Sequence, residues 1–78
     1  MLEEKIKQDE IKIGANIRRV RKNRKIGQTE LVQLLDLQGI NITRETLVKI
    51  ERGIQHIKAT QLKAIRDALN TSYDELLK

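Results

Sequence analysis

Isoleucine and leucine recur three and four positions apart along most of this chain, and no proline interrupts them. The 78 residues include 11 Ile, 10 Leu, four Gly and no Pro. Apolar residues at this spacing form one stripe on an α-helix, whereas a proline inside a helix would break it. The sequence therefore predicts an all-α protein with enough aliphatic side chains for one small core.

The pattern divides into five helices with short connections. We predict them at about residues 11–24, 28–38, 44–52, 61–69 and 72–77. The residues suited to start helices are Gly27, Thr43, Thr60 and Ser72, and those suited to end them are Gly39, Gly53 and Asn70. The inward-facing residues are expected to be Ile13, Ile17, Val20, Leu31, Leu34, Leu35, Leu47, Ile50, Leu62, Ile65, Leu69, Leu76 and Leu77. Residues 54–59 are predicted to be a loop.

The charge is concentrated in one segment. Residues 1–10 carry a net charge of −2, residues 11–26 carry +7 with no acid, and residues 27–78 are neutral overall. A concentrated cationic stretch on a balanced domain is what binding to a phosphate backbone needs. The alternative is that these bases only form the solvated face of the first helix.

Several classes of protein are excluded. Without cysteine the chain has no disulfide framework and no thiolate metal site, and His56 alone could not hold zinc. No apolar run is long enough for a membrane span, and the N-terminus does not read as a secretory signal, so we expect a cytoplasmic protein. We find no nucleophile–His–carboxylate set and no phosphate-cradling glycine loop, so we expect neither an enzyme nor a cofactor.

Two adjacent predicted helices are typical of a helix-turn-helix unit. The helix at 28–38 leads through a short Gly-containing connector into the helix at 44–52. In such a unit the first helix lies across the DNA backbone and the second presents side chains to base edges in the major groove. Arginine can bind guanine through two hydrogen bonds, and glutamate can accept one from cytosine. The side chains that we expect to contact bases are Arg44, Glu45, Thr46 and Lys49.

Four segments, taken in order, resemble one known family. They are Ile13–Arg21, Ile26–Leu31, Leu47–Gly53 and Leu69–Leu77, and they read IGANIRRVR, IGQTEL, LVKIERG and LNTSYDELL. At this spacing they are similar to the phage repressor/Cro-like helix-turn-helix transcriptional regulators of the xenobiotic response element type. The resemblance implies a compact five-helix, lambda-repressor-like DNA-binding domain in which helices two and three form the helix-turn-helix.

The resemblance also implies roles for single residues. Arg21 and Glu51 match a pair that ties helix one to helix three, and an Arg–carboxylate fork fixes such an angle well. Gln28 matches a phosphate contact at the start of helix two, where the helix dipole and free N–H groups favour an anion. Together with the cationic segment, the expected phosphate contacts are Gln28, Thr43, Arg18, Lys22, Lys25, His56 and Lys58.

The chain departs from the family pattern in three places. The stretch from Gln28 to Gly53 is about five residues longer than in the compact phage repressors, and we place the extra residues around 36–42. Lys25 stands where a glycine usually ends helix one, so that Asn23 or Lys25 must take up the turn. Residues 1–10 precede the usual start; they can extend helix one or fray, and we treat them as an extension of unknown role before a domain at 11–78.

Two functions remain open. The first is a sequence-specific regulator of double-stranded DNA, a repressor that binds a palindromic operator as a homodimer. The second is a protein-interaction module of the same fold, such as an antitoxin-like partner, because the segment from Leu2 to Ile6 is acidic and amphipathic. Residues 1–10, or the loop at 54–59 with helices four and five, are the candidate surfaces for a dimer or a protein partner.

Overall fold

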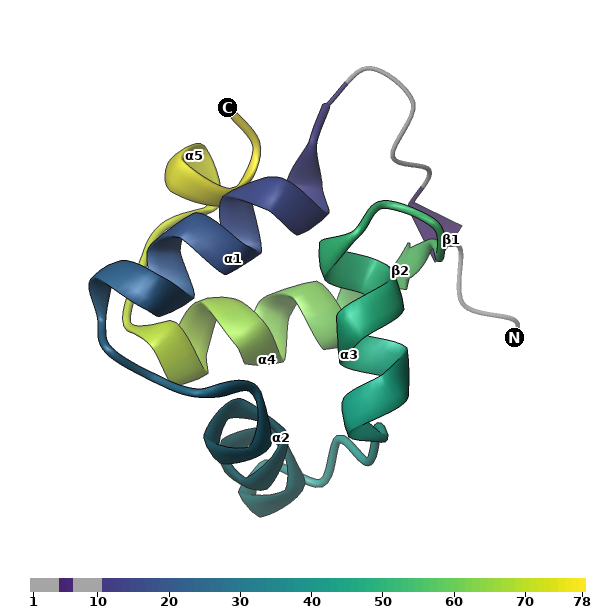
Figure 1. Cartoon of the computed structure of the whole chain (residues 1–78), viewed down its shortest axis with the longest axis vertical. Coiled ribbons are helices and arrows are strands. Elements are labelled where there is room, and N and C mark those ends of the chain that lie inside the picture. Colours follow the sequence, from purple (N-terminus) through teal and green to yellow (C-terminus); the bar gives the residue numbers. More distant parts are fainter. Residues whose placement is uncertain (1–4, 7–10) are drawn as a thin grey trace.

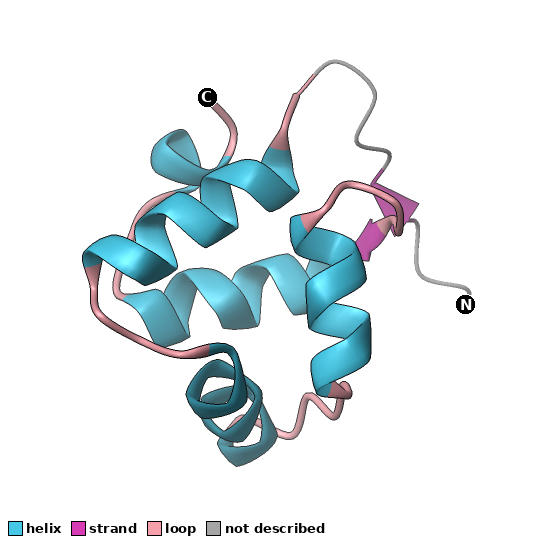
Figure 2. Ribbon diagram, viewed as in Figure 1, coloured by secondary structure: helices cyan, strands magenta, loops and turns pink. Residues whose placement is uncertain are grey.

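The fold is a cluster of five short helices with a two-stranded ribbon at one edge (Figure 1). The computed structural model describes residues 5–6 and 11–78. Within these residues the elements are β1 (Lys5–Ile6), α1 (Ile13–Asn23), α2 (Gln28–Leu37), α3 (Arg44–Glu51), β2 (Ile57–Lys58), α4 (Ala59–Leu69) and α5 (Tyr73–Leu76). The all-α prediction with five helices is confirmed, with the two short strands as an addition (Figure 2).

Most helix boundaries follow from the caps that the sequence contains. The Thr43 hydroxyl accepts the backbone N–H of Thr46 at 3.1 Å, and that of Ser72 accepts the N–H of Glu75 at 3.2 Å. Such bonds satisfy N–H groups that the first turn of a helix leaves without partners. The starts of α3 at Thr43 and of α5 at Ser72 are therefore where the sequence predicts them.

Left-handed residues end the helices. Gly39, Gly53 and Asn70 have φ values of 79°, 77° and 51°. Lys25, with φ 59°, takes up the turn after α1 that a glycine usually makes. A left-handed conformation costs a non-glycine residue about 1–2 kcal/mol, so this turn carries a small strain.

The prediction of a loop at 54–59 is confirmed for residues 54–56 and wrong for residues 57–59. Ile57 and Lys58 form β2, which pairs antiparallel with β1 in the register Lys5 with Lys58 and Ile6 with Ile57. Ile57 is fully buried in the core, and α4 begins at Ala59 rather than after Thr60. Gln61 caps the start of α4, because its side-chain oxygen accepts a hydrogen bond from the backbone N–H of Lys58 at 2.9 Å.

The strand β1 also corrects the expectation for the N-terminal segment. Lys5 and Ile6 neither extend α1 nor fray, because they pair with β2 and Ile6 packs against the core. The remainder of the expected extension, residues 1–4 and 7–10, lies outside the described residues.

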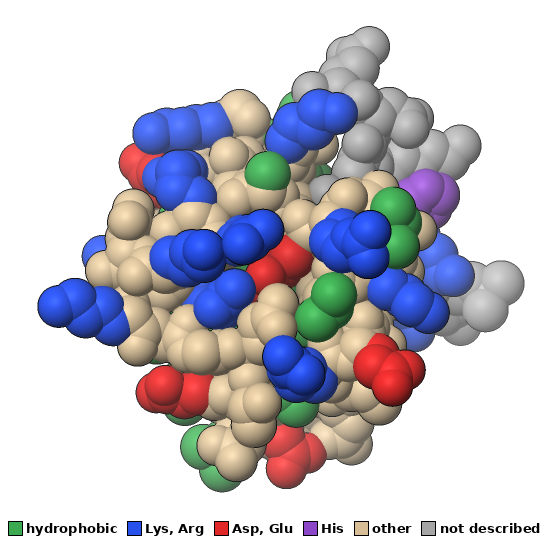
Figure 3. All heavy atoms as spheres, in the orientation of Figure 1, with side chains coloured by type: hydrophobic (Ala, Val, Ile, Leu, Met, Phe, Trp, Pro, Cys, Tyr) green, Lys and Arg blue, Asp and Glu red, His purple; other side chains and the backbone are tan. Residues whose placement is uncertain are grey.

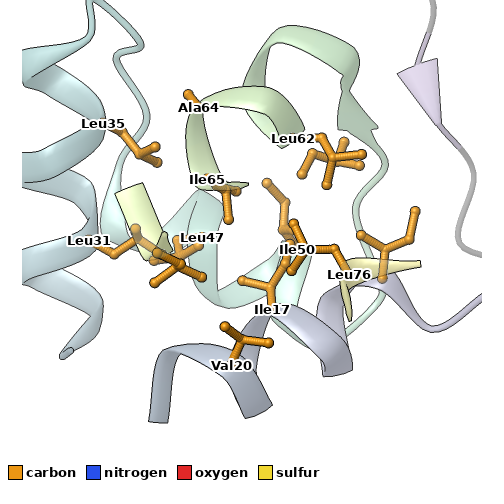
Figure 4. Packing of buried hydrophobic residues seen from close by; sticks show 13 residues of the cluster. Ile17, Val20, Leu31, Leu35, Leu47, Ile50, Leu62, Ala64, Ile65 and Leu76 are labelled. Atoms are coloured by element: carbon orange, nitrogen blue, oxygen red, sulfur yellow. The ribbon is translucent and has the colours of Figure 1, made fainter. Parts of the chain in front are cut away.

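The core is built from one face of each helix (Figure 4). Its buried residues are Ile13, Ile17, Val20, Leu31, Leu35, Leu47, Ile50, Ile57, Leu62, Ala64, Ile65, Leu69 and Leu76. Two expectations are wrong here: Leu34 is only half-buried, and Leu77 is exposed. Leu77 follows the last turn of α5, where Leu76 alone already reaches the core.

The packing places α3 at the front of the molecule. α1 packs against α3 and α5, α2 packs against α3 and α4, and α4 lies behind the other helices in the view of Figure 1. One side of α3 is thereby held by the core, and its opposite side is left to solvent. Over the described residues, no helix has the length and apolar character that crossing a bilayer requires.

The buried position of β2 gives a stability prediction. We expect Ile57→Ala to lower the free energy of unfolding by about 2–5 kcal/mol, because it removes buried methyl groups and leaves a cavity. The milder Ile57→Val should cost about 0.5–1.5 kcal/mol. Ile54→Ala is the matched control, since Ile54 is 64% exposed three residues earlier. Urea denaturation measures all three, and equal losses at positions 54 and 57 would contradict the fold.

Candidate nucleic-acid interface

The helix α3 has one anchored side and one free side. Leu47 and Ile50 are fully buried, whereas Arg44, Glu45 and Lys49 are exposed. Since a helix turns every 3.6 residues, Glu45 and Lys49 lie on the side away from the core and Arg44 lies at its edge. The structure thus places three of the four expected base contacts in solvent on a helix whose other face is fixed.

The fourth, Thr46, is half-buried and holds the start of the helix. Its backbone N–H donates to the Thr43 hydroxyl, and the two side-chain oxygens lie 3.1 Å apart. This paired cap fixes the backbone from which Arg44 and Glu45 project. Thr43 is exposed beside it, as its expected phosphate contact requires.

A buried ion pair sets the angle between the helices. Arg21 of α1 donates from Nε and Nη2 to the two carboxylate oxygens of Glu51 in α3, at 2.7 and 3.0 Å. Their side chains are 8% and 2% exposed. Arg21 also donates from Nη1 to the backbone oxygen of Ile26, at 2.9 Å. Because this oxygen lies just before α2, one guanidinium joins α1, the start of α2 and the end of α3.

Gln28 belongs to the same network. Its side-chain nitrogen donates to a Glu51 oxygen at 3.2 Å, and the residue is half-buried at the first position of α2. An amide nitrogen carries two hydrogens, so that one remains for another acceptor. The contact with Glu51 positions this group at the helix N-terminus, where an anion is favoured.

The cationic segment is divided between the fold and the surface. Arg19 donates to the carboxylate of Glu75 in α5 at 3.3 Å, and Arg24 donates to the backbone oxygens of Leu69 and Asn70 at the end of α4, both at 3.0 Å. With Arg21, three of the segment's bases therefore have hydrogen-bond partners within the domain. The exposed bases that remain in the segment are Lys12, Arg18, Lys22 and Lys25.

Two hollows flank α3. The first, about 330 Å³, lies between α1 and α3 and is lined by Arg18, Gln28 and Val48, among others. The second, about 590 Å³, is lined by Thr43, Thr46, His56 and Lys58, among others. Thr46 and Val48 are two positions apart and point about 160° away from each other, so the hollows lie on opposite sides of the helix.

The expected phosphate contacts are distributed over both sides. Arg18 and Gln28 line the first hollow, and His56 and Lys58 line the second. Lys22 and Lys25 line neither; they are exposed in the last turn of α1 and just after it. Figure 3 shows Lys and Arg side chains in blue over α1 and α3, around an acidic patch in red.

Sequence reasoning missed three residues of this face. Arg52 is exposed directly after α3 and lines the first hollow. Val48 and Ile54 line a shallow depression of about 300 Å³ along the outer side of α3, together with Arg44 and Lys49. Apolar side chains there can contact the methyl group of thymine in a major groove. Val48 follows Arg44 by four positions, and this spacing could have indicated that Val48 lies on the same face of the helix as Arg44.

Two side chains with shifted pKa values, Glu75 and Arg66, lie outside this face. The pKa of Glu75 in α5 is lowered, first by the hydrogen bond and the charge of Lys78 and then by Arg19. The pKa of Arg66 in α4 is raised by a hydrogen bond to Asp67. Glu75 therefore adds a little stability above its unfolded pKa that is lost as the pH falls through its folded value. Among the described residues, no three His, Cys, Asp or Glu side chains gather where they could hold a metal ion.

The comparisons with known proteins agree with this geometry. A family model described as helix-turn-helix matches residues 17–76, which include all of α2 and α3. Neither the comparison with curated proteins nor that with solved structures gave a significant match.

The ion pair gives the prediction for this site. Glu51→Ala leaves the buried charge of Arg21 without its carboxylate, so we expect a loss of about 3–5 kcal/mol in the free energy of unfolding. Glu75→Ala breaks the exposed pair with Arg19, in which the side chains are 41% and 42% exposed, and should leave the free energy of unfolding nearly unchanged. Thermal and urea unfolding of both variants measures this difference. A Glu51 variant as stable as the Glu75 variant would contradict the role of the ion pair.

Proposed function

The chain belongs to the Cro/CI-like helix-turn-helix family of DNA-binding regulators, and on this premise we propose that it is a sequence-specific repressor that binds a palindromic operator as a homodimer. One observation carries the proposal: α3 has its apolar side in the core and an exposed polar side that lies between two hollows lined by cations. A major groove likewise has base edges at its floor and one phosphate backbone along each side.

Base recognition is assigned to the free side of α3. Arg44 can donate two hydrogen bonds to guanine, and Glu45 can accept one from cytosine. Lys49, one turn later, can reach a base or a phosphate. Thr46 contributes through the cap that it shares with Thr43, which orders the first turn of α3 before DNA is bound.

Phosphate contacts position this helix. On one side of α3, α1 and the start of α2 supply Arg18, Lys22 and Gln28. On the other side, the proposed contacts are Thr43, His56 and Lys58. Contacts of this kind fix register and supply affinity without reading sequence. Lys25 is exposed near the same end of α1 and adds to the positive potential there.

A dimer follows from the limited number of contacts that one module can make. Two modules on half-sites about 34 Å apart combine their contacts and read an inverted repeat. Tyr73 and Leu77 support a dimer surface at α5, because both are partly exposed apolar residues four positions apart. Repression requires only that the bound dimer occupies promoter DNA.

The structure weakens the case for a protein-interaction module. The apolar residues that motivated it were Leu2 and Ile6, and Ile6 packs against the core of its own chain. Leu2 lies outside the described residues. The main observation behind this alternative is therefore partly accounted for by the fold.

Selection of bound duplexes from a random pool tests base recognition. We expect an inverted repeat with half-sites about one helical turn apart. Arg44→Ala should bind the selected operator about 1–3 kcal/mol more weakly and lose preference at one base position in each half-site. If the variant selects the same operator as the wild type, α3 is not the reading element.

A salt titration tests the phosphate contacts. Lys22→Ala should weaken binding by a similar factor for operator and unrelated duplexes, and should reduce the slope of log K against log salt by about 1. Lys63→Ala is the matched control, because Lys63 is an exposed cation of α4 outside the proposed interface. The affinity of a protein that makes several phosphate contacts falls by about 10³-fold or more between 50 and 200 mM salt. If the binding affinity does not change over this range, the protein-interaction alternative is favoured.

A further inference from the structure

Two lysines face each other across the β1–β2 ribbon. Lys5 and Lys58 are partners in the antiparallel register, and both are exposed. Side chains that are directly opposite in such a pair have Cβ atoms about 4.5–5.5 Å apart, and like charges at this distance destabilise the pairing. The ribbon therefore has an electrostatic cost that a bound anion would remove.

The same two lysines line the larger hollow beside α3. Its lining also includes His56, Thr43 and Thr46, and among the described residues that line it there is no Asp or Glu. The charged groups among these lining residues are two lysine ammonium groups, and the imidazole of His56 can also donate a hydrogen bond. A concave surface lined by such donors has the chemistry to bind a phosphate.

We propose that this hollow binds a backbone phosphate of operator DNA and that Lys5, from the N-terminal strand, is one of its ligands. The proposal rests on the proposed function, because α3 must lie in the groove for the hollow to face a DNA strand. It assigns a role to a residue of the N-terminal segment, which neither the sequence nor the family match does. The strand bound here is the one across the groove from Arg18 and Gln28.

The proposal links DNA binding to strand pairing. A phosphate between Lys5 and Lys58 replaces their repulsion by two attractions, so bound DNA stabilises the β1–β2 ribbon. By linkage, a paired ribbon also raises the affinity for DNA by the same factor. The N-terminal strand is then part of the DNA-binding surface as well as a cover for Ile57.

Lys5→Gln tests this with two readouts of opposite sign. Without DNA, the variant should unfold at a slightly higher temperature than the wild type, because the repulsion with Lys58 is gone. With DNA, it should bind about 5–10-fold more weakly at 0.1 M salt, equally for operator and unrelated duplexes, and its salt slope should fall by about 1. A purely structural role for Lys5 would change stability and affinity in the same direction.

Two control variants keep the test specific. Lys5→Arg retains the charge and should bind like the wild type, and Lys63→Gln removes an exposed charge on α4 and should leave affinity nearly unchanged. Ethylation of single phosphates should reveal one position that weakens the wild type and no longer affects Lys5→Gln. Inorganic phosphate at low millimolar concentration and fixed ionic strength should not compete with DNA.

The outcomes separate this inference from the function on which it rests. If the wild type shows no salt-dependent binding to any duplex, the proposed function fails. If the wild type binds but Lys5→Gln behaves like Lys63→Gln, only the role of Lys5 is overturned. Efficient competition by inorganic phosphate would show a site for a small free anion instead of a DNA contact.

Discussion

The arrangement of this domain depends on one buried ion pair. Arg21 and Glu51 form two hydrogen bonds that are almost completely shielded from water, and Ile26 and Gln28 complete the set of partners. A buried charge that loses its partner costs several kcal/mol, so the three elements that meet here have little freedom to move apart. The pair thus fixes the N-terminus of α2 relative to α3, the two parts that we propose contact DNA at the same time.

The bases of residues 11–26 differ in role because a charge packed against the protein needs partners. Three guanidinium groups bind acceptors of the same domain: Arg21 binds Glu51, Arg19 binds Glu75, and Arg24 binds the end of α4. Bases without such geometry, Arg18 and Lys22 among them, stay in solvent, where long-range attraction to phosphates is most effective. The high positive charge of residues 11–26 therefore reflects both structure and function.

The sequence predicted those features that depend on local chemistry. The apolar spacing indicated every helix, and caps such as Thr43 and Ser72 fixed where two of them begin. The pairing of Arg21 with Glu51 came from the resemblance to a family, since nothing local connects residues 30 positions apart. The exposure of Arg44 and Lys49 followed once Leu47 and Ile50 were taken as the inward side, whereas their contacts with bases stay a prediction.

What the sequence did not predict depends on contacts between distant residues. A strand of two residues is too short to show any periodicity, so the sequence predicts a loop at β2 and does not indicate that Ile57 belongs to the core. The partner strand lies some 50 positions earlier, in a segment that the sequence predicts either to extend helix one or to fray. Lys58 was expected at the phosphate backbone, but only the register of the ribbon brings Lys5 beside it.

Chemical methylation of DNA tests the central claim most directly, because dimethyl sulfate modifies guanine N7 in the major groove and adenine N3 in the minor groove. If α3 lies in the major groove, the bound protein protects guanine N7 atoms in two patches about one helical turn apart and leaves adenine N3 atoms reactive. Protection of adenine N3 alone, or unchanged reactivity at every guanine of a bound operator, would contradict the account.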